Sequence, residues 1–158
     1  MRFTIRHLEP ADYDPVIRVV DEWWGGRRMA DMLPRLFFVH FRPTSFVAEA
    51  DGRVVGFLAG FRSQTHEDQA YIHFVGVDPA WRASGVGRAL YERFFDAARA
   101  LGASEVHGVT SPVNRGSLAF HAAMGFELLP GDAAPGGAPC SIDYDGPGEP
   151  RVRLRKRI

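Results

Sequence analysis

The segment Arg82–Gly87 combines the residue types that a phosphate-binding loop needs. It reads R-A-S-G-V-G and lies between an apolar, strand-like run and an amphipathic, helix-like run. Because glycine has no side chain, successive main-chain N–H groups there can converge on an anion at the positive end of a helix. The arginines at 82 and 88 would add charge-assisted contacts. A plain turn between two packed elements is the alternative interpretation. The residues predicted to bind phosphate are Arg82, Ala83, Ser84, Gly85, Val86, Gly87 and Arg88.

Two familiar phosphate motifs do not describe this loop. The string G-x-x-x-x-G-K-[ST], whose lysine and hydroxyl bind phosphate and magnesium, occurs nowhere in the chain. The dinucleotide motif G-x-G-x-x-G fails because Leu90 stands where its third glycine should be. A nucleotide-binding switch is therefore disfavoured.

The hydrophobic pattern around the loop predicts an α/β fold in which a mixed sheet is flanked by helices. Asp51-Gly52 between two strand-like runs predicts a hairpin. The run 70–77 is apolar on both faces, so we expect a central strand there. We expect 131–150 to be a long loop and 151–158 an edge strand. Further strands are predicted over 3–8, 45–50, 53–61, 105–109 and 126–129, and helices over 15–24, 29–38, from the glycine loop to Gly102, and over 115–124.

Length and composition favour an ordinary globular protein. The 158 residues fit one domain, 1–158, and the formal net charge is zero, which favours neither nucleic acid nor a membrane surface. No apolar run approaches the ~20 residues of a membrane span, and charges near the N-terminus interrupt any signal peptide. Cys140 is the single cysteine, so no internal disulfide can form and a cytoplasmic location is expected. The histidines show no spacing typical of metal ligands, so we expect no metal.

A second segment, N-R-G-S-L-A-F-H-A-A-M-G-F over 114–126, follows the glycine loop after one helix and one strand. Together the two segments resemble the Gcn5-related N-acetyltransferase (GNAT) family. The resemblance implies a single-domain acyl-CoA N-acyltransferase fold with six or seven strands and about four helices. It also implies that the loop holds the pyrophosphate of acetyl-CoA, and that a homodimer forms through the last strands. Further cofactor-binding residues implied by it are Val75, Gly76, Val77, Asn114 and Ser117.

The reaction implied by the resemblance is direct attack of a primary amine, on a small molecule or peptide, on the acetyl thioester. Such a site needs a base for the amine, donors for the oxyanion and an acid for the thiolate. His121 occupies the place of the family's tyrosine acid, and the alternative is a histidine that only packs or binds the cofactor. We predict His73 as the base. The alternative is a histidine in the core whose hydrogen bonds are all made within the protein. Tyr71, which stands where some relatives carry a glutamate, is the third residue predicted to be catalytic. Strict alternation would place Tyr71, His73 and Val75 on one face.

Four residues are predicted to line the acceptor site. Trp23, Trp24 and Arg27 lie where family members build the acceptor wall, and Glu67 precedes the central strand. The alternative for the tryptophans is that they serve only in helix packing. The alternative for Glu67 is that it lies in a solvated loop. A sensor that binds acyl-CoA without turnover, or a transferase of a longer acyl group, also fits this pattern.

Overall fold

A computed structural model describes residues 2–158 of the chain. Over this range the chain forms seven strands and four α-helices, joined by loops and short 3-10 turns. The strands are β1 (Thr4–His7), β2 (Phe46–Ala50), β3 (Arg53–Arg62), β4 (Gln69–Val77), β5 (Glu105–Thr110), β6 (Glu127–Leu128) and β7 (Val152–Arg157). The helices are α1 (Tyr13–Trp23), α2 (Leu36–His40), α3 (Val86–Ala100) and α4 (Arg115–Ala123).

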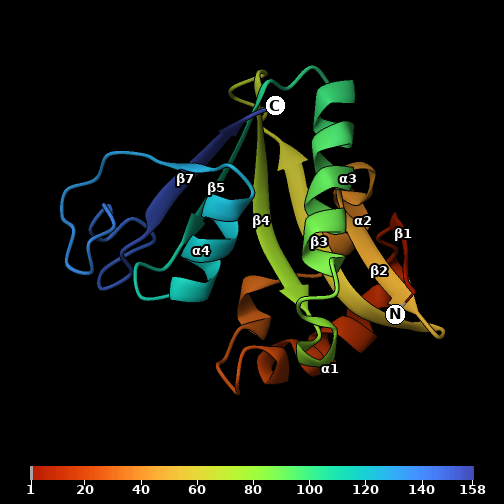
Figure 1. The fold of residues 1–158 in the computed structure, drawn as a ribbon. Helices are drawn as coiled ribbons and strands as arrows, with labels where there is room; N and C mark the ends of the chain where they lie inside the picture. The colour runs from red at the N-terminus through yellow and green to blue at the C-terminus, as the bar shows by residue number, and fades with distance from the viewer. Residues whose placement is uncertain (1) are drawn as a thin grey trace.

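All seven strands belong to one sheet in the order β1-β2-β3-β4-β5-β7-β6 (Figure 1). β4 and β5 are parallel, and the other neighbouring pairs are antiparallel. The predicted mixed α/β sheet and the central position of β4 are therefore confirmed. The hairpin between β2 and β3 is confirmed as well, because Asp51 (φ 51°) and Gly52 (φ 75°) both adopt the left-handed backbone that a tight hairpin turn requires.

Each face of the sheet has its own hydrophobic core. On one face, α3 packs Leu90 and Phe94 onto the sheet, because its apolar side chains recur at helical spacing. On the other face, α1 contributes Val16 and Val20, and α2 contributes Phe38. α3 lies along β3 and β4 in Figure 1, with α1 at the end of the sheet where β4 finishes. None of the helices within 2–158 combines the length and the apolar character that crossing a membrane requires.

The predicted second helix over 29–38 is wrong in extent. The structure has a 3-10 turn at Ala30–Met32 and then the short α2. Pro34 explains the interruption, because it offers no N–H to a helix and keeps the preceding residue, Leu33 (φ −126°, ψ 71°), out of the helical region.

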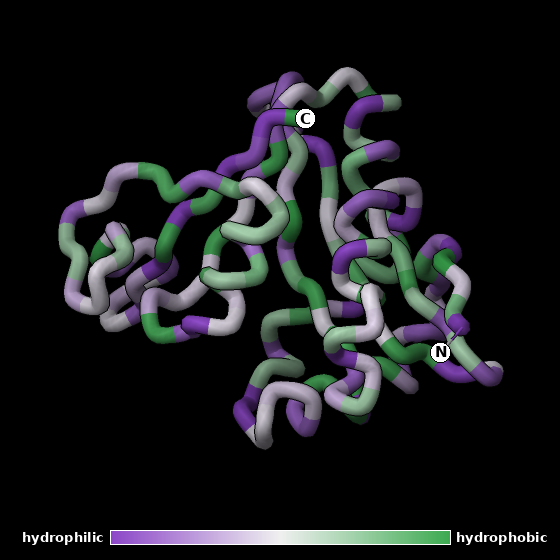
Figure 2. Tube along the Cα trace, viewed as in Figure 1, coloured by the Kyte–Doolittle hydropathy of each residue, from purple (hydrophilic) through white to green (hydrophobic). Residues whose placement is uncertain are grey.

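The tail strand was expected at an edge, and this is also wrong. β7 pairs with β5 along its whole length and with β6 on its other side, so β6 forms the edge. The alternation of hydrophilic and hydrophobic residues along β7 is visible in Figure 2, with Val152 and Leu154 buried. Such alternation indicates that one face of the strand is buried, but it does not indicate which strands pair with it on either side.

Candidate active site

The parallel strands β4 and β5 diverge at the centre of the sheet (Figure 1). Their pairing covers Gln69–Tyr71 of β4 and Glu105–His107 of β5, and the described residues contain no further pair between them. Beyond this point, residues 75–77 of β4 have a strand partner on the β3 side alone. We call this region the opening. Main-chain N–H and C=O groups at such an edge are free to pair with an extended ligand.

A β-bulge in β4 redirects the side chains beside the opening. Ala59 of β3 pairs with Phe74, whereas the next residue of β3 pairs with Ile72, so His73 is the extra residue. His73 and Phe74 therefore both lie on the face covered by α1 and α2, where His73 stacks on Phe37 at 4.4 Å between ring centroids.

The strict alternation expected along this strand is consequently wrong beyond the bulge. Tyr71 and His73 do share a face, but Val75 packs on the α3 side of the sheet. Gly76 faces α1, where a Cβ atom would lie 2.5 Å from Phe57 and 3.0 Å from Trp24. The missing side chain at Gly76 therefore makes room for aromatic packing on that side.

The loop before α3 presents a run of main-chain donors. Within the described residues, no hydrogen bond satisfies the N–H groups of residues 83–88. Gly85 is the N-cap of α3 with φ 89°, and it has no side chain with which to cap the helix. Free N–H groups at the start of a 15-residue helix form a site of positive potential that suits an anion.

Side chains of the loop fasten it to α1 and to the preceding turn. The Arg82 guanidinium donates to the main-chain oxygen of Trp23, and the Ser84 hydroxyl donates to the oxygen of Trp81. Ala83 adopts φ 62°, a left-handed conformation that disfavours residues with a Cβ atom. Arg88 is exposed and lies 3.9 Å from Glu92. The guanidinium of Arg82 therefore helps to shape the loop, in addition to carrying charge.

His121 on α4 has both ring nitrogens engaged. Its Nδ1 lies 2.7 Å from the main-chain oxygen of Ser117, and because a carbonyl only accepts, Nδ1 is assigned the hydrogen. Nε2 then accepts from the Tyr91 hydroxyl at 2.8 Å. Burial lowers the pKa of His121 below its ordinary value of 6.5, with the bond to Ser117 acting in the opposite direction. This environment favours the neutral imidazole.

The lowered pKa of His121 predicts a loss of stability in acid. The unfolded chain takes up this proton near pH 6.5, whereas the folded protein takes it up at lower pH. The free energy of unfolding should therefore fall as the pH drops from about 6.5 through the folded pKa, by at most about 1.4 kcal/mol per pH unit. Urea unfolding of wild type and His121→Gln between about pH 5 and 8 measures this. His66→Gln, at an exposed position, is the control. An acid dependence that is identical in His121→Gln and wild type contradicts the assignment.

His73 and Tyr71 belong to an aromatic cluster on the α2 side of β4. The His73 Nε2 lies 2.5 Å from the main-chain oxygen of Met32, so Nε2 is the donor and Nδ1 keeps the lone pair. Burial raises the pKa of Tyr71 to about 12, which keeps its phenol un-ionised at neutral pH. Consecutive rings lie 4.4–5.5 Å apart between centroids. The rings follow one another in space from Tyr71 through Phe61, Phe41 and Phe37 to His73.

The four predicted acceptor residues lie in different surroundings. Trp23 is buried and stacks on Phe57. Trp24 is half-buried against Phe74, beside the opening, and Arg27 is exposed in the turn after α1. Glu67 is exposed in the turn before β4, at the end of the sheet where β4 and β5 still pair. The structure therefore brings Trp24 to the opening but not Glu67.

Asn114 and Ser117 organise the start of α4. The Asn114 side chain caps the helix by accepting from the Ser117 N–H at 3.1 Å. The Ser117 hydroxyl accepts from Thr110 of β5 at 2.9 Å. Two features of the site were not predicted from the sequence. They are Tyr91 on α3 and the phenylalanines of the aromatic cluster on the α2 side of β4. The available signal for Tyr91 was a single hydroxyl on the otherwise apolar face of α3.

Comparison with known proteins identifies a family for this chain. The model of the acetyltransferase (GNAT) family matches residues 5–126. An L-2,4-diaminobutyric acid acetyltransferase of Nocardia farcinica is 36% identical over 84 residues, which cover 53% of this chain and 44% of that protein. The matched segment thus spans less than half of that relative's length.

The fold is similar to that of solved structures. Ard1 from Thermoplasma volcanium has a TM-score of 0.80 at 22% identity, covering 100% of this chain and 99% of the other. The yncA protein of Salmonella typhimurium, solved with its cofactor acetyl-CoA, has a TM-score of 0.70 at 20% identity over 98% of this chain and 93% of that chain. The expected acyl-CoA N-acyltransferase fold is therefore confirmed.

Proposed function

This chain belongs to the acetyltransferase (GNAT) family, and from that premise we propose that it transfers the acetyl group of acetyl-CoA to a primary amine of a small molecule or peptide. The observation that carries the proposal is the run of unsatisfied N–H groups over residues 83–88, placed at the end of β4 beside the opening. A diphosphate at this loop and an extended arm along the edge of β4 would together match coenzyme A.

The residues present fit this cosubstrate. N–H groups of residues 83–88 would hold the diphosphate, with Arg82 and Arg88 adding positive charge. The main chain of Val75, Gly76 and Val77 would pair with the pantetheine arm, and Asn114 and Ser117 would border it from α4. When bound, acetyl-CoA supplies the acetyl group as a reactive thioester.

His73 is proposed as the base that removes the proton of the attacking amine. Support comes from its tautomer, because the bond to Met32 occupies Nε2 and leaves the Nδ1 lone pair available. Tyr71 shares this face and is proposed as a hydrogen-bond donor beside His73. The aromatic cluster and Trp24 supply an apolar wall, which favours an acceptor with an apolar or aromatic body. Arg27 is proposed to complete the acceptor side. Trp23, which is buried, would support it from behind through Phe57, and Glu67 would be reached only by an acceptor long enough to extend to the β3–β4 turn.

His121 is proposed to protonate the departing thiolate. Its place on α4, across the opening from β4, supports this role. For this step the ring would take up a second hydrogen and act as an imidazolium, which gives one hydrogen to the thiolate and returns to the neutral resting state with both nitrogens hydrogen-bonded. The same state is also compatible with the second candidate function, an acyl-CoA sensor without turnover.

An amine panel with detection of the free thiol tests the proposed function. We expect thiol release from acetyl-CoA with at least one primary amine, with one acetylated product per thiol. Propionyl-CoA and longer acyl thioesters run in parallel distinguish a transferase of longer groups. Binding of acetyl-CoA without release across the whole panel would favour the sensor, and absence of binding contradicts both functions.

The organisation of the protein is a further part of the proposal. We propose that residues 1–158 form one acetyltransferase domain, supported by the single sheet that contains all described strands. A cytoplasmic location is proposed on the basis of the lone, buried Cys140. A homodimer through the last strands is proposed because the short β6 leaves an edge at which Leu128 is 42% exposed.

A further inference from the structure

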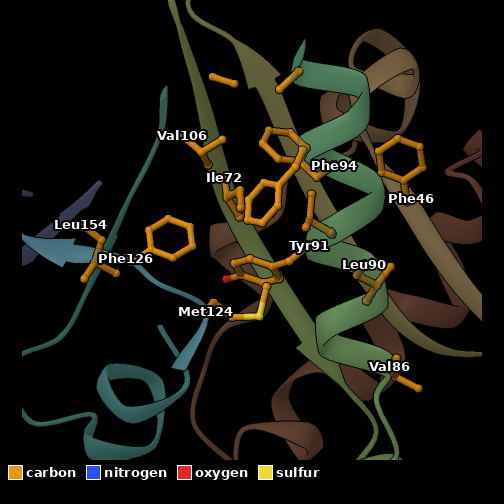
Figure 3. Close-up of a cluster of buried hydrophobic side chains, with 14 of the residues drawn as sticks. Phe46, Ile72, Val86, Leu90, Tyr91, Phe94, Val106, Met124, Phe126 and Leu154 are labelled. Atoms are coloured by element: carbon orange, nitrogen blue, oxygen red, sulfur yellow. The ribbon is translucent and has the colours of Figure 1, made fainter. Parts of the chain in front are cut away.

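Tyr91 connects the two sides of the opening. It lies in the middle of α3 with 3% of its surface exposed. Figure 3 shows its ring leaving α3 toward Met124 and Phe126. Within residues 2–158, the hydroxyl has one hydrogen-bond partner, the Nε2 of His121 on α4, at 2.8 Å. A buried hydroxyl without a partner is unfavourable, so this bond is a strong constraint on both side chains.

The bond is one link of a longer polar chain. From His121 the chain continues through Nδ1 to the main-chain oxygen of Ser117. The Ser117 hydroxyl in turn accepts from Thr110, the buried last residue of β5. The chain therefore runs from α3 through α4 to β5, crossing from one wall of the opening to the other.

Aromatic packing holds the Tyr91 ring independently of its hydroxyl. The ring meets Phe120 edge-on at 5.0 Å and Phe126 at 6.0 Å between centroids. The α4 side chains that meet this ring, Phe120 and His121, are partly buried. Replacing Tyr91 with phenylalanine should consequently remove the hydrogen bond and leave the packing in place.

We infer that Tyr91 is a positioning residue for His121: its hydroxyl, bonded to Nε2, fixes the ring orientation of His121 and ties α4 to α3 across the opening. The inference rests on the proposed function, because the orientation of the His121 ring decides where the acid of acetyl transfer lies. Without the hydroxyl, Nε2 loses its donor, and the ring is held only by the bond from Nδ1 to the Ser117 oxygen, so it is freer to rotate.

Kinetics and NMR of Tyr91→Phe test the inference. With acetyl-CoA and the best amine of the panel, we expect kcat to fall about fivefold, the rate equivalent of one neutral hydrogen bond. The KM for acetyl-CoA should stay within about twofold, because the hydroxyl contributes to the reacting geometry and not to uniform binding. Spectra of isotope-labelled histidine should show the Nδ1–H tautomer of His121 in both proteins, with the Nε2 resonance shifted in Tyr91→Phe because this nitrogen has lost its hydrogen-bond donor.

Tyr13→Phe is the matched control, since it removes a phenol hydroxyl from α1 and should leave kcat and the His121 Nε2 resonance unchanged. Tyr91→Phe with wild-type kcat and an unshifted His121 Nε2 resonance overturns the inference while the proposed function stands. A wild type that transfers no acetyl group overturns the proposed function. In that case the NMR comparison alone decides whether Tyr91 fixes His121.

Discussion

Replacing Gly85 with valine should weaken acetyl-CoA binding by at least about 100-fold while the protein remains folded. Gly85 adopts φ 89° as the N-cap of α3, and no atom lies within 4 Å of the position that a Cβ atom would take. The obstacle is therefore backbone strain of about 1–3 kcal/mol, which valine relieves by rotating the loop. That rotation separates the N–H groups. Losing two charge-assisted hydrogen bonds weakens binding by at least about 100-fold. Isothermal titration calorimetry with acetyl-CoA measures the loss.

Gly102→Val is the matched control for this substitution. Gly102 follows the other end of α3, has the same φ of 89°, and also has no atom within 4 Å of a Cβ position. Both variants should lose similar stability in urea, yet Gly102→Val should bind acetyl-CoA like wild type. Gly87→Ala adds one methyl group at ordinary contact distance, 3.4 Å from Phe120, and should bind within about threefold of wild type. Normal binding by Gly85→Val would contradict the role of the loop.

His73→Gln should reduce kcat/KM by about 100-fold, the lower end of the contribution expected from a positioned general base. Glutamine can still donate to the main-chain oxygen of Met32, as His73 does at 2.5 Å. Its amide, however, cannot take up a proton near neutral pH. The variant therefore separates a structural role from a catalytic one. Steady-state rates across pH should show that the pH dependence of kcat/KM flattens.

Two further variants make this comparison decisive. His73→Ala removes the bond to Met32 and the stacking on Phe37 as well, so it should lose stability in addition to activity. His40→Gln, at an exposed position at the end of α2, should leave rate and pH profile unchanged. If His73→Gln retains the wild-type rate and pH profile, His73 is a structural histidine and a different group accepts the proton.

Much of the fold could be predicted because its signals are local. The Asp51-Gly52 turn and the apolar periodicity of α3 each occupy a short stretch of sequence, and both were correctly assigned. The place of β7 between β5 and β6 could not be predicted, because it depends on pairing between segments far apart in the chain. The bulge at His73 has no local signal either, since one extra residue leaves the apolar pattern of β4 unchanged.

The site shows the same division between local and distant information. The glycine loop was predicted from spacing, and the structure adds that its donors lack partners within the described residues. The state of His121 could not be predicted, because it depends on Tyr91, which lies 30 residues away in the chain. In the sequence, Tyr91 is one more residue on the buried face of a helix.

The most direct test of the central claim is a calorimetric comparison of coenzyme A with acetylpantetheine, which lacks the diphosphate together with the 3′-phosphoadenosine that it carries. If unpartnered main-chain nitrogens at the start of α3 hold that group, coenzyme A should bind saturably and at least about 100-fold more tightly than the truncated thioester. No heat on mixing with coenzyme A, or equal affinity for the two compounds, would show that the loop is only a turn.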